Sequence, residues 1–484
     1  MASDTVLPVF IGPFPAEKHQ KECNEISATT EDNLSRFVKY IAKNADVRNR
    51  YPEDKLQEHI SYIEDKIQTI CAKVGEFDSR FSSSKIVRQG SSYKRTKILK
   101  PDELDYMPIL AMFNEETVVV EDVKENCQKK DEGYVYIKVK NAAVEDNLGD
   151  LCEQNLSGPY HEGDRTFCSV SLYLKCGEIY LTKLHEAVKW ALSQINSLTS
   201  KDEHKHKDED HDVPLGHISV CEGLFHGPCI TLKIGAPLCT AKVDLCFSIE
   251  GRVTNLGRCV MVSGEHCDRS CRCGHPGLPD STHWKENPVD PPNKYELSES
   301  HKELFLTLKL INHILKKTCH HLGTSQPTAS YETLTLLWQH QQTCQAMNVG
   351  ECYRNIVQML NPDQPDKLHE LYVKVHYSGQ QGVIQDRFFP KEKGLITSFA
   401  CVGFMWFLHQ VSHTESTEWW ETLLIENTKY HDNKYLSTLC EALNKANEMH
   451  EHYIFSSEPP PPPQTVTWRD DRNNSKASLT ISCW

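Results

Sequence analysis

The chain has 484 residues, which is enough for two or three domains with hydrophobic cores of their own. Its net charge of −14 excludes a protein that coats nucleic acid with its whole surface, although phosphate binding needs only a local basic patch. The 20 cysteines are scattered, and MASDTVLPVF at the start lacks the basic and apolar regions of a signal peptide, so we expect reduced thiols and a cytoplasmic protein.

The first part of the chain mixes helical and strand patterns. Apolar residues at three- and four-residue steps predict two helices within residues 30–80, and Pro52 suits the start of the second. Residues 252–294 are rich in Pro, Gly, Cys and His and are expected to be a loop. Strands are expected in the basic stretch after residue 85 and at 103–106, 134–140, 229–235 and 241–251, and a further helix at 182–198.

The second part of the chain is helical from about residue 297. The apolar run 395–411 is short for a bilayer span and contains His409 and Gln410, so we expect a buried helix. The fold class is therefore predicted as α+β, with a mixed lobe, a helical lobe and a cleft between them. The expected segments are 1–29 at the N-terminus, 30–294 as the mixed lobe, 295–395 as the helical lobe, 396–457 as extra helices and 458–484 as a Pro-rich disordered tail.

Two carboxylates stand on one predicted strand. The stretch GSSYKRTKILKPDELDY at 90–106 places Glu103 and Asp105 on the same face, because alternate side chains of a strand share a face, and Leu104 packs behind them. Two like charges held together favour a bound divalent cation. Taken alone, such a pair is more often two solvated acids on an edge strand.

Asp244 supplies a third acid. It lies between Val243 and Leu245 in a β-patterned apolar run, where a carboxylate is costly unless it is paired or bound to a metal. An acid at the end of a strand is the alternative interpretation. Beside the first pair, Asp244 favours a metal site made of Glu103, Asp105 and Asp244, of the kind that metal-dependent phosphoryl transfer uses.

Four motifs in order carry a resemblance to a known family. They are Gly90-Ser91 followed by Glu103-Leu104-Asp105-Tyr106; Gly227-Pro228-Cys229-Ile230-Thr231-Leu232 leading into Val243-Asp244-Leu245; Ala329-Ser330-Tyr331 opening a helix that continues to Leu337-Trp338; and Arg387-Phe388-Phe389-Pro390. Over about residues 50–395 the chain resembles the cyclic GMP-AMP synthase-like receptors (cGAS-like receptors), within the male-abnormal-21 family of the nucleotidyltransferase superfamily.

The resemblance implies a bilobal nucleotidyltransferase fold, with a twisted sheet and a long spine helix in the catalytic lobe and an all-helical C-terminal lobe. Glu103, Asp105 and Asp244 would be the catalytic residues and would hold two Mg²⁺ or Mn²⁺ ions. Gly90 and Ser91 would form the turn that binds a nucleotide phosphate through hydroxyl and backbone N–H groups.

In the helical lobe the resemblance implies three nucleotide contacts. Lys309 would bind the triphosphate, Ser330 would contact the nucleotide and Tyr331 would stack on a base. Without the family, Lys309 is as readily a solvated helix lysine, and Tyr331 is more readily a core aromatic residue.

A zinc site is expected only outside the family's usual place. The vertebrate synthase of the family has a site of one His and three Cys between its lobes, but the equivalent stretch here, 295–310, contains no cysteine. Thiol and imidazole groups do gather at Cys267, Cys271, Cys273 and His275, which form a candidate zinc site, the alternative being a loop of reduced thiols.

A basic stretch offers candidate contacts for nucleic acid. Residues 85–100 contain no acid, and their basic side chains could face an activating nucleic acid or the substrate triphosphates. The candidate nucleic-acid contacts are Lys85, Arg88, Lys94, Arg95 and Lys97. The resemblance implies activation by a ligand, for which double-stranded RNA, read by its shape and backbone, is expected, with a ligand-induced oligomer and no membrane partner.

The expected function is therefore a ligand-activated nucleotidyltransferase that makes a cyclic dinucleotide from ATP, GTP or other nucleoside triphosphates in innate immune sensing and antiviral defence. Two alternatives stay open: a catalytically silent interaction protein of the male-abnormal-21 type, and a template-free RNA nucleotidyltransferase. The three acids and the Gly-Ser turn favour the enzyme over the silent protein.

Overall fold

The structure is a computed structural model in which the chain forms two compact units, Met1–His19 with Tyr51–Lys294 and Gln20–Arg50 with Tyr295–Trp484. The fold class is α+β, as predicted, and the last division between the two units falls after Lys294, where the predicted mixed lobe also ends. The structure describes residues 8–11, 32–123, 127, 130, 132–140, 148–162, 165–174, 183–195, 212–221, 229–263, 283–322, 330–360, 388, 400–414, 416–429, 439, 441, 464–470 and 475–481.

A mixed sheet forms the centre of the first unit, in the strand order β1-β2-β3-β10-β9-β8. β1 is parallel to β2 and β3 is parallel to β10, whereas the other neighbours are antiparallel. The parallel pair brings together two strands that lie far apart in the sequence. The strands are β1 (Val9–Ile11), β2 (Ser83–Gln89), β3 (Glu103–Leu110), β8 (Ile218–Val220), β9 (Ile230–Gly235) and β10 (Thr240–Leu245).

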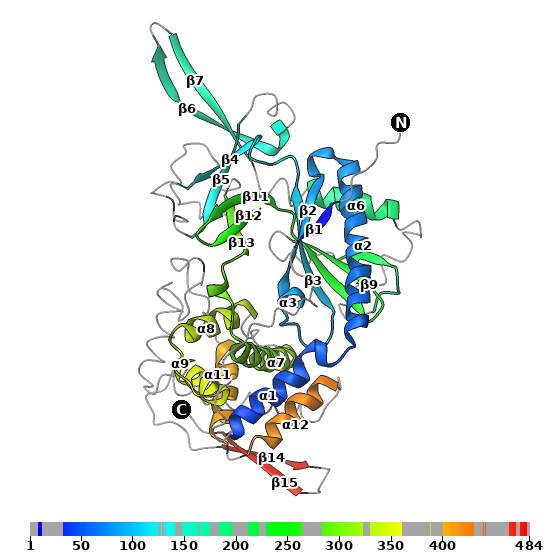
Figure 1. The fold of residues 1–484 in the computed structure, drawn as a ribbon, viewed down its shortest axis with the longest axis vertical. Helices are drawn as coiled ribbons and strands as arrows, with labels where there is room; N and C mark the ends of the chain where they lie inside the picture. Colours follow the sequence, from blue (N-terminus) through cyan, green and yellow to red (C-terminus); the bar gives the residue numbers. More distant parts are fainter. Residues whose placement is uncertain are drawn as a thin grey trace. The chain divides into compact units, whose positions relative to one another are not determined.

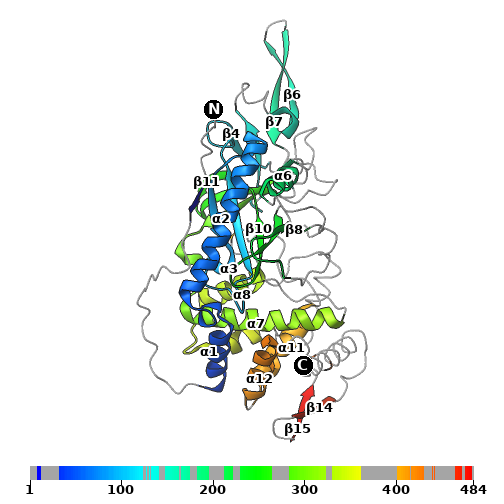
Figure 2. The same cartoon turned by 90° about the vertical axis from the view of Figure 1, so that its right-hand side faces the viewer.

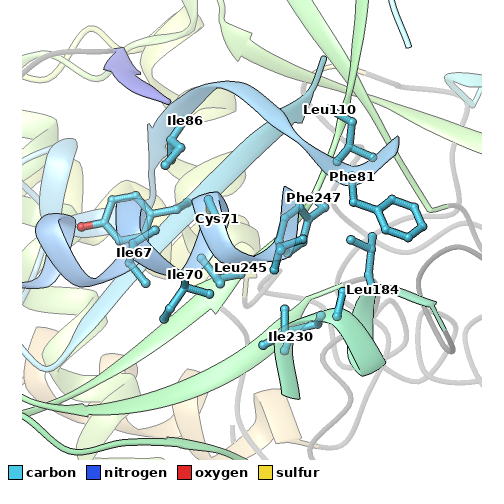
Figure 3. Packing of buried hydrophobic residues seen from close by; sticks show 14 of the residues in the cluster. Ile67, Ile70, Cys71, Phe81, Ile86, Leu110, Leu184, Ile230, Leu245 and Phe247 are labelled. Carbon is cyan, nitrogen blue, oxygen red and sulfur yellow. The ribbon is translucent and has the colours of Figure 1, made fainter. Parts of the chain in front are cut away.

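Helix α2 (Glu53–Phe77) lies along this sheet, and α6 (His185–Ile195) packs beside it (Figures 1 and 2). Pro52 directly precedes α2, and the acids of its first turn suit the positive end of the helix dipole. Apolar side chains of both helices and of the sheet form one buried cluster, which Figure 3 shows around Ile67 and Leu245. This cluster is the main core of the first unit.

A second sheet completes the first unit, in the order β11-β12-β13-β5-β7-β6, with β4 paired to β5. The hairpin of β6 and β7 extends away from the rest of this sheet (Figure 1). The strands are β4 (Val118–Asp122), β5 (Tyr134–Val139), β6 (Cys152–Glu162), β7 (Arg165–Leu174), β11 (Ile249–Thr254), β12 (Gly257–Ser263) and β13 (Trp284–Asp290). The prediction of a loop over 252–294 is wrong for β12 and β13. The polar composition of 264–282 hid the short alternation of apolar residues on either side of it.

The second unit consists mainly of helices within the described residues, with one hairpin near its C-terminus. Its helices are α1 (Asn33–Ala45), α7 (Glu299–Leu322), α8 (Ser330–Thr343), α9 (Val349–Leu360), α11 (Ala400–Ser412) and α12 (Glu418–Lys429). Helix α11 confirms the predicted buried helix, since Phe404, Phe407 and Leu408 are all at most 2% exposed. The side-chain amide of Asn312 donates to the Thr333 hydroxyl at 3.0 Å and links α7 to α8.

Helix α1 belongs to the second unit, so the grouping of residues 30–50 with the mixed lobe is corrected. Its fully buried stripe, which includes Phe37, packs against α7 and α9, with the rings of Phe37 and Tyr353 edge to face at 6.2 Å. The Thr307 hydroxyl of α7 also donates to the backbone carbonyl of Val38 at 2.9 Å. A helical periodicity alone does not show which partner an apolar stripe will pack against.

The proposed disordered tail, 458–484, contains an antiparallel hairpin of β14 (Gln464–Asp470) and β15 (Ser475–Ile481), so the prediction is wrong for these residues. Alternating residues such as Val466 and Trp468 give the period-two pattern of a strand, which the preceding proline block obscured. Among the described residues, none of the helices is long and apolar enough to cross a membrane.

Candidate active site

Three carboxylates lie on one face of two neighbouring strands. Asp244 of β10 is paired directly with Asp105 of β3, and Lys242 is paired with Glu103. Side chains paired across a sheet point to the same face, and so do residues two apart on a strand. The parallel register therefore gathers Glu103, Asp105 and Asp244, which the sequence analysis proposes as one metal site.

The burial of alternate residues shows why this face can carry charge. Leu104 of β3 and Val243 of β10 point to the opposite face and belong to the core beneath α2. On the acid face, Met107 and Ile109 further along β3 pack in a separate cluster with Val260 of β12. The acids precede this covered part of the strand, which leaves them only partly buried.

Asp244 is held by a buried hydroxyl. The Thr231 hydroxyl donates to Oδ1 of Asp244 at 2.6 Å, and Thr231 is 2% exposed. The two residues are direct partners in the β9–β10 hairpin. This hydrogen bond fixes the orientation of the Asp244 carboxylate and does not involve its second oxygen, Oδ2.

The turn after β2 places Gly90 against the second acid. Gly90 has φ +80°, and a Cβ atom at this position would lie 1.6 Å from Oδ2 of Asp105. Both the backbone conformation and the close approach therefore require glycine. The short helix α3 (Gly90–Tyr93) begins here, and its Ser92 hydroxyl donates to the Glu103 backbone carbonyl at 2.8 Å. Ser91 lies next to Gly90 and is partly exposed.

Lys97 pairs with two acids at the start of β3. Its Nζ lies 2.9 Å from a carboxylate oxygen of Asp102 and 2.9 Å from Oε2 of Glu103, while its own side chain is only 8% exposed. Burial works to lower the pKa of Lys97, yet the charges of Glu103 and Asp102 raise it above its ordinary value. Lys97 is therefore a cation within the site that orients Glu103.

The donor set fits hard divalent cations, since three carboxylates supply only oxygen ligands. Among the described residues the three acids do not form a group in which all ligand oxygens lie within 4.8 Å of one another. Glu103 turns to Lys97 and Asp244 to Thr231, as expected for carboxylates that repel one another. A cation would have to compete with Lys97 for Glu103.

One buried histidine joins the segments that lead into the two acidic strands. Nδ1 of His59 accepts the backbone N–H of Leu238 at 3.2 Å, so Nε2 carries the proton and donates to the backbone carbonyl of Pro101 at 2.9 Å. Burial lowers the pKa of His59, which keeps the ring neutral. Sequence reasoning overlooked this anchor, because His59 sits within an ordinary helical pattern of α2.

Several basic side chains of the stretch 85–100 form ion pairs within the fold. Arg88 binds Glu64 of α2 with Nε and Nη2 at 2.7 and 2.9 Å, and these side chains are 9% and 8% exposed. Lys97 is buried as described, and Lys85 pairs with Glu250. A nucleic-acid contact is the wrong prediction for Arg88 and Lys97, whose charges are already neutralised inside the fold. For Lys94 and Arg95 it stays a prediction.

The nucleotide contacts proposed for the helical lobe all lie in the second unit. Lys309 is on α7, with Nζ 5.9 Å from the centre of the Phe305 ring. Ser330 begins α8, and Tyr331 is 37% exposed, so it is not a core aromatic residue. The candidate zinc residues Cys267, Cys271, Cys273 and His275 lie outside the described residues.

Comparisons with known proteins give only distant likenesses. No family model and no curated protein matches the sequence. Among solved structures, CdnC of E. coli MS115-1 with ATP is 9% identical, with a TM-score of 0.33, over 88% of this chain and 94% of that chain. DncV of Vibrio cholerae in its 3'-deoxy ATP bound form is 12% identical, with a TM-score of 0.33, over 84% of this chain and 87% of that chain.

DncV of Escherichia coli in its 3'-deoxy GTP bound form is 12% identical, with a TM-score of 0.34, over 84% of this chain and 87% of that chain. Identities and TM-scores as low as these do not assign a function. Any function for this chain must therefore be inferred from its own residues.

Proposed function

We propose that the chain is a metal-dependent nucleotidyltransferase that joins two nucleoside triphosphates into a cyclic dinucleotide. The observation that carries this proposal is the register of β3 and β10. It sets Asp244 beside Asp105, and Glu103 lies two residues before Asp105 on the same partly exposed face. A Gly-Ser turn lies against one of these acids, Asp105. Carboxylates beside a turn rich in backbone N–H groups suit a metal-bound triphosphate.

Each residue of the site has a defined task in this proposal. Glu103, Asp105 and Asp244 would hold two Mg²⁺ or Mn²⁺ ions, which would supply activation of the attacking hydroxyl and neutralise the leaving pyrophosphate. Thr231 fixes the orientation of Asp244, and Lys97 orients Glu103. Gly90 lets the turn approach Asp105 so closely that the Ser91 hydroxyl and backbone N–H can face a phosphate.

The transfer step balances without any further reactant. A sugar hydroxyl oxygen of one nucleotide bonds to the α-phosphorus of another, and the bond from that phosphorus to the oxygen bridging to the β-phosphate breaks. Pyrophosphate leaves with the electron pair, and the hydroxyl proton passes to solvent. The same step within the linear dinucleotide closes the ring. From the second unit, Lys309 would bind a triphosphate, with Ser330 and Tyr331 contacting the nucleotide.

A single assay separates the candidate functions. Purified full-length chain is incubated with labelled ATP, GTP, CTP and UTP, with Mg²⁺ or Mn²⁺, and with or without duplex RNA or duplex DNA. A small cyclic product supports the proposal, and its dependence on duplex RNA supports an RNA-activated sensor in innate immunity. Extension of RNA ends supports the template-free transferase instead. Absence of any product with every metal and ligand supports the silent interaction protein.

A further inference from the structure

Four side chains of the kinds that bind metal ions meet in the second unit. His301 lies in the first turns of α7, His340 near the end of α8, Cys344 just after α8 and Cys352 in α9. One ligand atom of each lies within 4.8 Å of the others, and all of these residues except Cys344 are buried. The chain thus converges on one point from three helices.

The two histidines present unused nitrogens at this point. His301 and His340 are 8% and 4% exposed, their ring centres are 5.4 Å apart, and neither Nε2 has a hydrogen-bond partner among the described residues. Nδ1 of His301 is 2.7 Å from the Ser298 hydroxyl, which fixes the ring and directs Nε2 inward. Buried nitrogens of this kind normally have a partner.

The two cysteines complete the set. Their Sγ atoms are 3.5 Å apart, and both thiols are free. This separation is far longer than a disulfide bond and close to the ~3.8 Å between two thiolates on a tetrahedral zinc ion with Zn–S bonds of about 2.3 Å.

We propose that His301, His340, Cys344 and Cys352 bind one structural Zn²⁺ ion, through the two Nε2 and two Sγ atoms. Two thiolates and two imidazoles are a soft and borderline donor set that selects zinc over Mg²⁺ or Ca²⁺. The protein supplies all four ligands of a tetrahedral site, so the ion would stabilise the fold and would not itself react. The inference is independent of the proposed nucleotidyltransferase activity.

The site would tie three helices together. The Ser298 backbone N–H already donates to the side-chain carbonyl of Gln341 at 2.7 Å, which joins the start of α7 to the end of α8 beside the cluster. Cys352 brings α9 to the same junction. These four residues differ from the candidate zinc residues at 267–275 that the sequence suggested.

Metal content of the intact chain gives the direct test. Full-length protein is expressed in zinc-supplemented medium, dialysed against metal-free buffer and measured by elemental mass spectrometry. About one Zn²⁺ per chain is expected. Replacing zinc with Co²⁺ should give the thiolate-to-metal charge-transfer absorption of a tetrahedral sulfur and nitrogen site. Removing the metal with a chelator should lower the unfolding temperature of the second unit by about 5–10 °C.

Variants locate the ion. Cys344→Ala and His340→Gln should each lose the bound zinc, whereas Cys259→Ala, which changes a buried cysteine of the first unit, should retain it. The Co²⁺ spectrum of the unmodified chain keeps the test decisive if a variant does not fold. Three results would overturn the proposal: no zinc in the intact chain, zinc retained by Cys344→Ala but lost in Cys267→Ala, or a Cys344–Cys352 disulfide in the protein purified without reductant.

Discussion

Asp244 carries a negative charge on a strand whose neighbouring residues, Val243 and Leu245, are fully buried. At the scale of single residues, such a charge is tolerated because Thr231 binds one oxygen and because the acid face of the sheet is only partly covered. Gly90 contributes differently, since what matters there is the side chain that it lacks. Both neighbours can be tested by substitutions that spare the acids themselves.

Gly90→Ala should damage both stability and activity. Its methyl group would meet the Asp105 carboxylate, and the left-handed φ would add about 1–2 kcal/mol of backbone strain. Gly216→Ala is the matched control, because Gly216 has φ +88° but an added Cβ would meet only the Tyr62 hydroxyl, at 3.6 Å. Thermal unfolding should show a loss in both variants, whereas nucleotide transfer should fall only in Gly90→Ala. Equal activity in the two variants would contradict the close packing on Asp105.

Thr231→Val should lower activity without unfolding the protein. Valine keeps the β-branched shape of this buried strand residue but removes the hydroxyl that donates to Asp244. Loss of such an orienting partner typically costs about 10–100-fold in rate or metal affinity. Thr231→Ser keeps the hydroxyl and should retain most of the activity. Steady-state rates of the two variants, measured with Mn²⁺ titrations, check this prediction. Equal rates would show that the Thr231 hydroxyl does not support the activity.

At the scale of elements, the acids stay in register because the segments before β3 and β10 are fastened to α2. His59 performs this role with one backbone donor and one backbone acceptor, and both bonds require a neutral ring. Further along the same helix, Glu64 accepts hydrogen bonds from Arg88 of β2 and from the Tyr93 hydroxyl. The Tyr93 hydroxyl in turn lies 2.7 Å from the Tyr106 hydroxyl of β3. The strand ends and the strand centre are thus each fixed to α2.

The protein should lose stability as the pH falls below about 6.5, the ordinary pKa of histidine in the unfolded chain. The pKa of His59 is lowered by burial, and that of His409 is lowered to about 4 by burial and by His413, so the unfolded state binds protons that the folded state does not. The stabilisation is therefore complete above pH 6.5 and is lost as the pH falls towards 4. Each such proton adds a slope of at most about 1.4 kcal/mol per pH unit.

His59→Gln should flatten this pH dependence, because the titrating ring is gone. His217→Gln is the matched control, since it removes an exposed histidine of the same unit and leaves the contacts of His59 with Pro101 and Leu238 in place. Free energies of unfolding measured in urea between pH 4 and pH 7.5 decide the matter. An unchanged slope in His59→Gln would show that another group causes the acid sensitivity.

Arg88→Ala should destabilise the first unit by about 3–5 kcal/mol, because it leaves Glu64 buried without its cation. The exposed Lys94 of the same basic stretch offers a contrast, and Lys94→Ala should change stability by about 0.5 kcal/mol or less. Denaturant unfolding measures both. A stable Arg88→Ala variant that had lost only nucleic-acid binding would restore the role that the sequence first suggested for Arg88.

At the scale of the whole molecule, features set by residues close together in the sequence were predicted better than pairings between distant segments. Alternation placed Glu103 and Asp105 on one face, and the charge of Asp244 in an apolar run marked it as unusual. The four-residue connection between β9 and β10 also determines the pairing of Thr231 with Asp244, so this contact could have been found from the sequence. The ion pair of Arg88 with Glu64 could not, because it depends on how α2 packs.

The histidine and cysteine cluster shows the same limit. His340 and Cys344 are four residues apart, which is a metal-ligand spacing at the end of a helix, but His301 and Cys352 come from other helices. A search for compact motifs instead favoured residues 267–275, where four potential ligands are close in sequence. Similarly, the apolar stripe of α1 predicted a helix and did not reveal that its partners are α7 and α9.

The most direct test of the central claim is the rate of nucleotide transfer in Asp244→Asn. Asparagine keeps the shape of the side chain and an oxygen that can accept from Thr231, so the fold should be preserved while the charge for cation binding is lost. With labelled nucleoside triphosphates and Mn²⁺, the rate of dinucleotide formation should fall about 100-fold or more. Asp122→Asn, which alters an exposed acid paired with Arg252, should match the unmodified protein. Equal product from Asp244→Asn and the unmodified protein would contradict the account.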